Sequence, residues 1–255
     1  MKLGIVQMPM AWTSEENTKV MCDVLNQHSY LDIVLFPELS ISGFHRNIRE
    51  EIKADKISEA VRQIANACRA SKIAAFVGSP TINNGLYYNS YLAFDEKGEV
   101  VAHWHKAGLT PSESEVFEPG RFSVVNKICG LACTALICRE ANDSSWFINE
   151  CQPDLPDIVI WPCYVGNLSN DSDDTGFNDG VSRIAKNLSA YLFQTNWPVS
   201  LNQPEATGLG GSKVFSPKGA ILAQLPIDKT CIGIFDLDTH FLSVEPLNLS
   251  IDAIQ

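Results

Sequence analysis

The order of segments in the first half of the chain recurs in the second half. The stretch LDIVLFPE (31–38) is echoed by PDIVIWPC (156–163), and SYLAFDEKGEVVAH (90–103) is echoed by SKVFSPKGAILAQL (212–225). Three matched pairs lie 125, 118 and 121 residues apart: Asp32 and Asp157, Pro80 and Pro198, Gly98 and Gly219. Chance could produce one such pair, but several in the same order indicate two similar halves. We therefore predict one pseudo-symmetric α/β domain over residues 1–255.

Each half combines short apolar segments, rich in Val, Ile and Phe, with amphipathic helical patterns. In the first half we expect strands over 3–8, 32–38 and 73–80, helices over 15–29 and 56–72, and a hairpin over 87–106. A strand that is apolar along both faces must be covered on both. Two sheets packed on each other, with helices outside, satisfy this requirement. The sequence thus predicts a four-layer α-β-β-α sandwich, with a three-layer doubly wound sheet as the alternative.

Composition limits the partners and the compartment. The net charge of −11 argues against nucleic acid or an anionic membrane as the main partner. No signal peptide is visible, and no apolar run approaches the ~18 residues of a membrane helix, so we expect a cytoplasmic location. The eight cysteines show no zinc-finger spacing and are expected to be free thiols, which predicts no metal site. The polar segment 167–180 is expected to form a loop.

Residues that could react follow three of the expected strands. Glu38 ends DIVLFPE, Lys106 follows the hairpin in HWHK, and Cys138 ends the apolar run TALIC. Reactive groups collect at the carboxyl ends of strands in α/β sheets. A desolvated carboxylate suits a general base, a semi-buried ammonium can stabilise an oxyanion, and a thiol can act as nucleophile. Taken singly, each also fits an ordinary role: a capping or ion-paired glutamate, a solvated lysine, a buried thiol.

Together these residues resemble the Glu-Lys-Cys constellation of the nitrilase superfamily, the carbon-nitrogen hydrolases. The motifs FPELSISG, HWHKAGLTPSE and ALICRE come in the family's order, and GGSKVFSPKGAILA is similar to its final hairpin. The resemblance covers nearly the whole chain and implies an αββα sandwich that needs no metal or organic cofactor. It implies that Cys138 attacks the substrate carbon and that Glu38 takes the thiol proton and later activates water. Lys106 and the backbone N–H of Arg139 would stabilise the oxyanion.

The resemblance also implies a second glutamate that positions the lysine and the substrate. Glu113, in the pattern E-x-x-x-F-x-P-G, matches this position best, and Glu115 is the second choice. Arg139, Glu140 and Cys163 are candidates for substrate binding. Arg139 replaces the family's usual aromatic residue, and it could pair with a substrate carboxylate or with Glu140 or the acidic surface. Cys163 occupies the matching strand end of the second half, where a buried thiol near the cleft is the simpler interpretation.

The activity implied by the resemblance is hydrolysis of a small linear amide to a carboxylate and ammonia or an amine, through a thioester. A nitrilase and an amide-to-amine acyltransferase would use the same three residues, so both stay open. A non-catalytic interaction protein on the same fold is disfavoured, because every matching triad position holds the required residue type. The expected partner is a small-molecule amide or nitrile, and the resemblance suggests a homodimer or a higher homo-oligomer.

Overall fold

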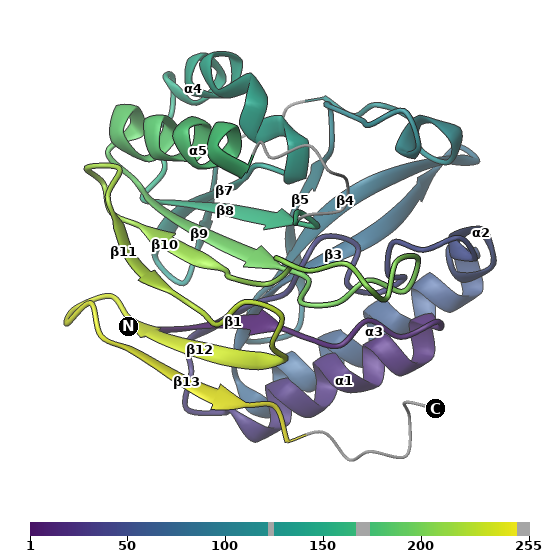
Figure 1. Cartoon of the computed structure of the whole chain (residues 1–255). Coiled ribbons are helices and arrows are strands. Elements are labelled where there is room, and N and C mark those ends of the chain that lie inside the picture. Colours follow the sequence, from purple (N-terminus) through teal and green to yellow (C-terminus); the bar gives the residue numbers. More distant parts are fainter. Residues whose placement is uncertain (122–124, 167–173, 249–255) are drawn as a thin grey trace.

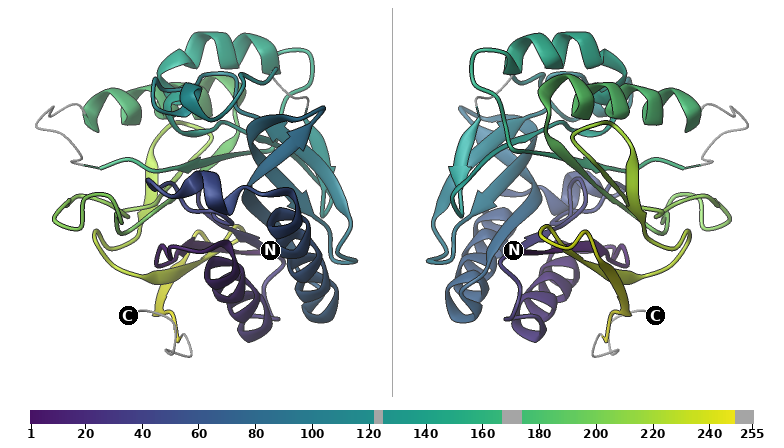
Figure 2. Two further views of the ribbon diagram at one scale, coloured as in Figure 1. Left: turned by 90° about the vertical axis from the view of Figure 1, so that its right-hand side faces the viewer. Right: turned by 90° about the vertical axis from the view of Figure 1, so that its left-hand side faces the viewer.

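The computed structural model describes residues 1–121, 125–166 and 174–248. Two β-sheets lie face to face, and helices cover the outer face of each sheet (Figure 1). Helices α1 (Ser14–Gln27) and α3 (Ala54–Ser71) cover one side, and α4 (Ser144–Cys151) and α5 (Asp174–Leu188) cover the other. The side views show the same layers (Figure 2). The predicted four-layer α-β-β-α sandwich is therefore confirmed over the three-layer alternative.

The first sheet contains seven strands in the order β13-β12-β1-β2-β3-β4-β5, and the second contains six in the order β11-β10-β9-β8-β7-β6. The strands of the first sheet are β1 (Lys2–Gln7), β2 (Ile33–Leu35), β3 (Ala74–Asn83), β4 (Leu86–Phe94), β5 (Val100–His105), β12 (Cys231–Asp236) and β13 (Leu242–Pro246). Those of the second sheet are β6 (Asn126–Ile128), β7 (Leu131–Ala135), β8 (Ile158–Cys163), β9 (Tyr191–Asn196), β10 (Lys213–Phe215) and β11 (Ile221–Gln224). A short helix, α2 (Ile48–Glu51), follows β2.

The two sheets repeat one topology. Strands β1, β2 and β3 run parallel and are followed by antiparallel β4 and β5. Strands β7, β8 and β9 run parallel and are followed by antiparallel β10 and β11. The predicted pair of similar halves is thus visible as two sheets with the same strand order. Three further strands extend the sheets: β12 pairs with β1, β13 pairs with β12, and β6 pairs with β7. The sequence patterns did not identify them.

Helix α5 begins earlier than the sequence indicated. The expected loop over 167–180 is wrong for residues 174–180, which belong to α5, while residues 167–173 lie outside the described part of the chain. The helix is held by an apolar stripe further along, where Val181, Ile184, Ala185 and Leu188 are buried at helical spacing. Packing of this stripe on the second sheet outweighs the polar composition of the first turns.

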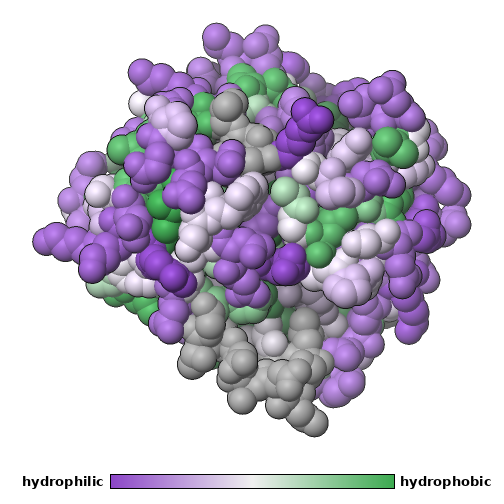
Figure 3. Space-filling view, turned by 90° about the horizontal axis from the view of Figure 1, so that it is seen from above, coloured by the Kyte–Doolittle hydropathy of each residue, from purple (hydrophilic) through white to green (hydrophobic). Residues whose placement is uncertain are grey.

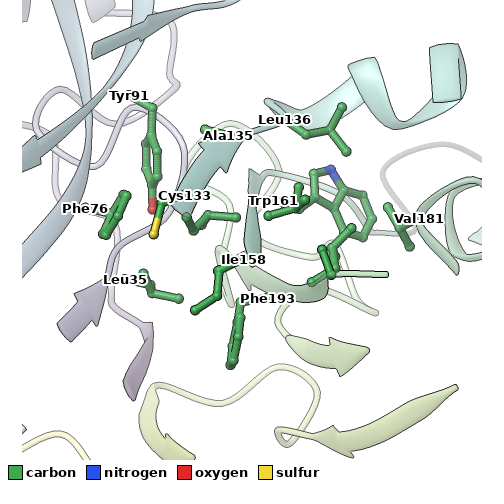
Figure 4. Packing of buried hydrophobic residues seen from close by; sticks show 14 of the residues in the cluster. Leu35, Phe76, Tyr91, Cys133, Ala135, Leu136, Ile158, Trp161, Val181 and Phe193 are labelled. Atoms are coloured by element: carbon green, nitrogen blue, oxygen red, sulfur yellow. The ribbon is translucent and has the colours of Figure 1, made fainter. Parts of the chain in front are cut away.

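The main core fills the space between the sheets. Figure 4 shows side chains of the first sheet, among them Leu35, Phe76 and Tyr91, lying opposite Cys133, Ala135, Ile158 and Phe193 of the second. Burying one such large apolar side chain contributes roughly 1.5–3 kcal/mol to folding. This core fixes the strands, and with them the segments that follow their carboxyl ends.

The outer surface is mixed in character. The face seen from above, over α4 and α5, is largely hydrophilic with separate hydrophobic areas (Figure 3). Within the described residues, none of the helices combines the length and the apolar character that crossing a membrane requires.

The turn after β2 is pressed against Gly78 of β3. A Cβ on Gly78 would lie 2.1 Å from the backbone N of Leu39 and 2.4 Å from the backbone O of Pro37. We expect Gly78→Ala to displace this turn and to lower the free energy of unfolding by about 1–3 kcal/mol or more, measured by urea denaturation. Gly85→Ala is the control, because open space surrounds it and only its positive φ of 78° is unfavourable. An equal or smaller loss for Gly78→Ala would contradict this account.

Candidate active site

A buried lysine stands at the centre of the candidate site. Lys106 follows β5, is only 1% exposed, and donates hydrogen bonds from Nζ to two carboxylates. Nζ lies 2.7 Å from Oε1 of Glu38 and 2.6 Å from Oε1 of Glu113. Burial alone would lower the pKa of Lys106, but the charges of neighbouring groups, first of all Glu38, raise it above its ordinary value. Lys106 is therefore a cation at neutral pH.

Local structure brings both glutamates to the lysine. Glu38 lies in the turn after β2, and its backbone O accepts a hydrogen bond from Nε1 of Trp197 at 2.7 Å. The next residue, Leu39, has a φ of 49°, a left-handed conformation that is unfavourable for a bulky side chain. Complete burial of Leu39 in an apolar cluster compensates for this strain. Glu113 begins a short 3₁₀ helix, Glu113–Glu115, whereas the alternative Glu115 is exposed and makes no ion pair with Lys106.

The two carboxylates differ in their hydrogen bonds. Oε2 of Glu113 accepts from the backbone N–H of Thr110 at 2.8 Å. Oε2 of Glu38 has no hydrogen-bond partner among residues 1–121, 125–166 and 174–248. Burial raises the pKa of Glu38, although Lys106 opposes this shift. Burial acts on Glu113 in the same direction, but the charge and hydrogen bond of Lys106 and the bond from Thr110 keep the pKa of Glu113 below its ordinary value. Glu38 is thus the better proton acceptor, and Glu113 is held as an anion.

Asn89 is a member of the site that the sequence analysis did not identify. Its Nδ2 donates to Oε1 of Glu38 and to Oε1 of Glu113, both at 2.8 Å. Its backbone O accepts the backbone N–H of Lys106 at 2.8 Å. The only sequence signal is a polar side chain in the strand segment YYNSYLAF, and such a signal does not indicate what the side chain contacts.

Cys138 lies just beyond β7, at the start of the 3₁₀ helix Cys138–Asp143. It has a φ of 50°, and its backbone O accepts a hydrogen bond from Nε1 of Trp161 at 2.9 Å. Burial and the charge of Glu38 raise the pKa of the Cys138 thiol above its ordinary value, and Lys106 opposes them. The thiol is therefore protonated at rest and needs a base. The backbone N–H of Arg139 lies in the first turn of the helix, where amide groups lack partners within the helix.

Within the described part of the chain, the carboxylate of Glu140 hydrogen-bonds to backbone groups only. Its Oε1 accepts from the N–H groups of Ala107 at 2.7 Å and Gly108 at 3.1 Å, and its Oε2 accepts from that of Ile137 at 2.6 Å. Glu140 is 5% exposed. Its carboxylate therefore ties the loop after Lys106 to the segment before the cysteine, and this arrangement supports a positioning role more than the expected substrate contact.

Arg139 and Cys163 have different surroundings. The guanidinium of Arg139 is partly buried and makes one weak contact, Nη1 to the backbone O of Leu109 at 3.5 Å. It forms no ion pair with Glu140 or with any other described residue. It borders a cavity of about 480 Å³ whose other lining residues are Ala107, Gly108, Leu109, Ser114, Phe117, Glu118 and Pro119. Cys163 has no exposed surface, and its Sγ accepts a hydrogen bond from Nε2 of Gln194 at 3.4 Å.

The eight cysteines are all free thiols. Across the described ranges, no three His, Cys, Asp or Glu side chains are grouped so that they could hold a metal ion.

A fold of two sheets between helices, with a buried lysine, two glutamates and a strand-end cysteine, points to one class of enzyme. Residues 2–147 match the sequence profile of the carbon-nitrogen hydrolases. The chain belongs to this family and is a carbon-nitrogen hydrolase of the nitrilase superfamily.

Known relatives are distant in sequence but close in fold. The amidase from Nesterenkonia sp. AN1 superposes with a TM-score of 0.81 at 20% identity, covering 93% of both chains. The carbon-nitrogen hydrolase from Helicobacter pylori G27 gives 0.80 at 17% identity, covering 94% of this chain and 90% of that one. In sequence, a cyanide hydratase from Aspergillus niger is 24% identical, over 82% of this chain and 70% of its own length.

We expect Glu140→Gln to loosen the link between the lysine loop and the cysteine turn. The new amide N–H₂ would face a backbone N–H, and each lost charge-assisted bond costs about 1.5–3 kcal/mol. The melting temperature should fall, and alkylation of Cys138 by iodoacetamide should change in rate, measured by intact mass. Glu150→Gln, an exposed carboxylate of α4, is the control and should leave both unchanged. Wild-type stability and alkylation in Glu140→Gln would refute the positioning role.

Proposed function

We propose that this enzyme hydrolyses a small linear amide to a carboxylate and ammonia or a small amine, through a thioester on Cys138. One observation carries the proposal: the Lys106 ammonium is buried between two carboxylates, and one of them, Glu38, retains an unbonded oxygen for the proton of the thiol. The fold shared with amidases supports an amide as the substrate. The eight free thiols support a reducing compartment such as the cytoplasm.

The chemistry follows from the placement of these groups. Glu38 accepts the thiol proton while Sγ of Cys138 attacks the amide carbon. Nζ of Lys106 uses two of its three N–H groups on the glutamates, and the third, with the backbone N–H of Arg139, stabilises the oxyanion. Glu38 then donates the proton to the leaving nitrogen, and a thioester remains. Glu38 next takes a proton from water while the water oxygen attacks the thioester carbon, and it returns this proton to Sγ of Cys138 as the C–S bond breaks. The free thiol is restored, and the acid leaves as a carboxylate after losing its proton to the released ammonia or amine.

A nitrile is the second candidate substrate, because a cyanide hydratase is among the relatives in sequence. The same thiol would add to the nitrile carbon, and Glu38 would supply a proton to the nitrogen. Acyl transfer to an amine would proceed from the same thioester. We also propose a homodimer or higher homo-oligomer, as the family resemblance implies.

We expect Cys138→Ala to abolish ammonia release from small amides while the protein stays folded. The thiol is the only protein group in the proposed mechanism that forms a bond to the substrate carbon, so turnover should fall to the uncatalysed rate. The assay is coupled ammonia detection across formamide, acetamide, propionamide and the matching nitriles, with circular dichroism as the folding check. Cys129→Ser is the control, because Cys129 is an exposed thiol that has no part in the proposed mechanism. Persistent ammonia release by Cys138→Ala would rule out the mechanism, and turnover of nitriles without amides would favour a nitrilase.

The unpaired guanidinium of Arg139 suggests a preference for amides that carry a carboxylate. We expect succinamic acid to have a KM about tenfold lower than butyramide, the gain of one charge-assisted pair of about 1.4 kcal/mol. Arg139→Gln should make the two KM values nearly equal, and Arg139→Lys should retain part of the difference. Arg183→Gln, an exposed arginine of α5, serves as the control. Equal KM values for both substrates in the wild type would show that the Arg139 side chain does not recognise the substrate.

A further inference from the structure

Asn89 holds the two glutamates by the same atoms that bind the lysine. We propose that Asn89 is a positioning residue that fixes Glu38 in the orientation needed to deprotonate Cys138; this inference rests on the proposed function. Its Nδ2 lies 2.8 Å from Oε1 of Glu38 and 2.8 Å from Oε1 of Glu113. Each of these oxygens also accepts from Nζ of Lys106. The four groups therefore form a closed ring in which an ammonium and an amide alternate with two carboxylates.

The ring determines which oxygen of Glu38 is available. Because Oε1 is bound by two donors, the carboxylate cannot rotate without breaking both hydrogen bonds, and Oε2 is left as the oxygen without a partner in the described chain. The backbone O of Asn89 accepts the backbone N–H of Lys106 at 2.8 Å, so the same residue also fixes the main chain of the lysine. Asn89 thus contacts three groups of the site, the two glutamates through its side chain and Lys106 through its backbone.

The presence of a side-chain amide at position 89 is explained by function better than by packing. Asn89 has no exposed surface, and its Oδ1 has no hydrogen-bond partner within the described residues. A buried acceptor without a partner costs about 1–3 kcal/mol, and an apolar side chain would avoid this cost. An aspartate would place a third carboxylate against two others, and a lysine would place a second ammonium beside the first. The amide donates two hydrogen bonds and adds no charge.

The groups around Glu38 determine in which direction its pKa moves when the hydrogen bond from Asn89 is removed. Lys106 and Glu113 are the charged groups that shift the pKa of Glu38, and the hydrogen bond from Asn89 lowers it. The thiols of Cys138 and Cys163 are the other titratable groups that interact with the charge of Glu38. Removing this bond raises the pKa of Glu38, so less of the carboxylate is ionised at a given pH. The acidic limb of the reaction of Cys138 must then move to higher pH.

The test compares Asn89→Leu, which removes both donors at similar volume, with Asn89→Ala as a second variant that creates no steric conflict. The matched control is Ser90→Ala, the next residue of β4, whose Oγ contacts Thr81 and His105 instead of the site. Two readouts are recorded against pH: the rate at which iodoacetamide alkylates Cys138, located by mass spectrometry, and kcat/KM for a small amide. Circular dichroism confirms folding.

For Asn89→Leu or Asn89→Ala we expect kcat/KM to fall about 10- to 100-fold with KM nearly unchanged. In both pH profiles the acidic limb should move to higher pH by about one unit, as expected when one hydrogen bond to a charged group is lost. Ser90→Ala should follow the wild type. Profiles of folded Asn89 variants that coincide with Ser90→Ala would overturn the inference and leave the proposed function standing. A wild-type Cys138 that is neither alkylated preferentially nor needed for ammonia release would instead overturn the proposed function.

Discussion

The site depends on one buried ion cluster, the ammonium of Lys106 between two carboxylates. Taking an ammonium out of water costs several kcal/mol unless opposite charges and hydrogen bonds compensate for it. Glu38 and Glu113 supply the charges, and they lie 68 and 7 residues from the lysine in sequence. The turn after β2, the end of β5 and a 3₁₀ helix must therefore meet at one point. Removing any member leaves the others uncompensated, so the cluster couples the folding of these segments to the chemistry.

The two similar sheets bring the segments of the site together, but they do not determine which side chains these segments carry. Glu38 follows β2 of the first sheet and Cys138 follows β7 of the second, and face-to-face packing brings these strand ends together. The position in the second half that matches Glu38 holds Cys163, which is fully buried and bound to Gln194. Of the two matching strand ends, the one at Glu38 belongs to the charged cluster and the one at Cys163 does not. Backbone strain marks the site, with positive φ values next to Glu38 and at Cys138 itself.

Periodicity and internal repetition were enough to predict the layers, because the central strands are buried on both faces and read as continuous apolar runs. They failed at the margins, where β13 is an exposed edge strand and β6 has only three residues, and they also missed β12, although it is buried. For the site, strand-end placement and motif order indicated Glu38, Lys106, Glu113 and Cys138, and the structure places the first three in contact. Asn89 was missed because its role lies in hydrogen bonds to residues 51 and 24 positions away. No local pattern encodes such bonds.

The three consecutive residues Cys138, Arg139 and Glu140 contact different parts of the structure. The Cys138 thiol interacts with the charges of Glu38 and Lys106, while the carboxylate of Glu140 accepts from the N–H groups of Ala107, Gly108 and Ile137. A turn anchored at residue 140 fixes the backbone of the residue in between, so the N–H of Arg139 is set by its neighbours and not by its own side chain. The guanidinium is then free to line the adjoining cavity. Under the proposed function, substitutions at position 139 are therefore expected to change the substrate preference without moving the backbone N–H of Arg139 or Cys138.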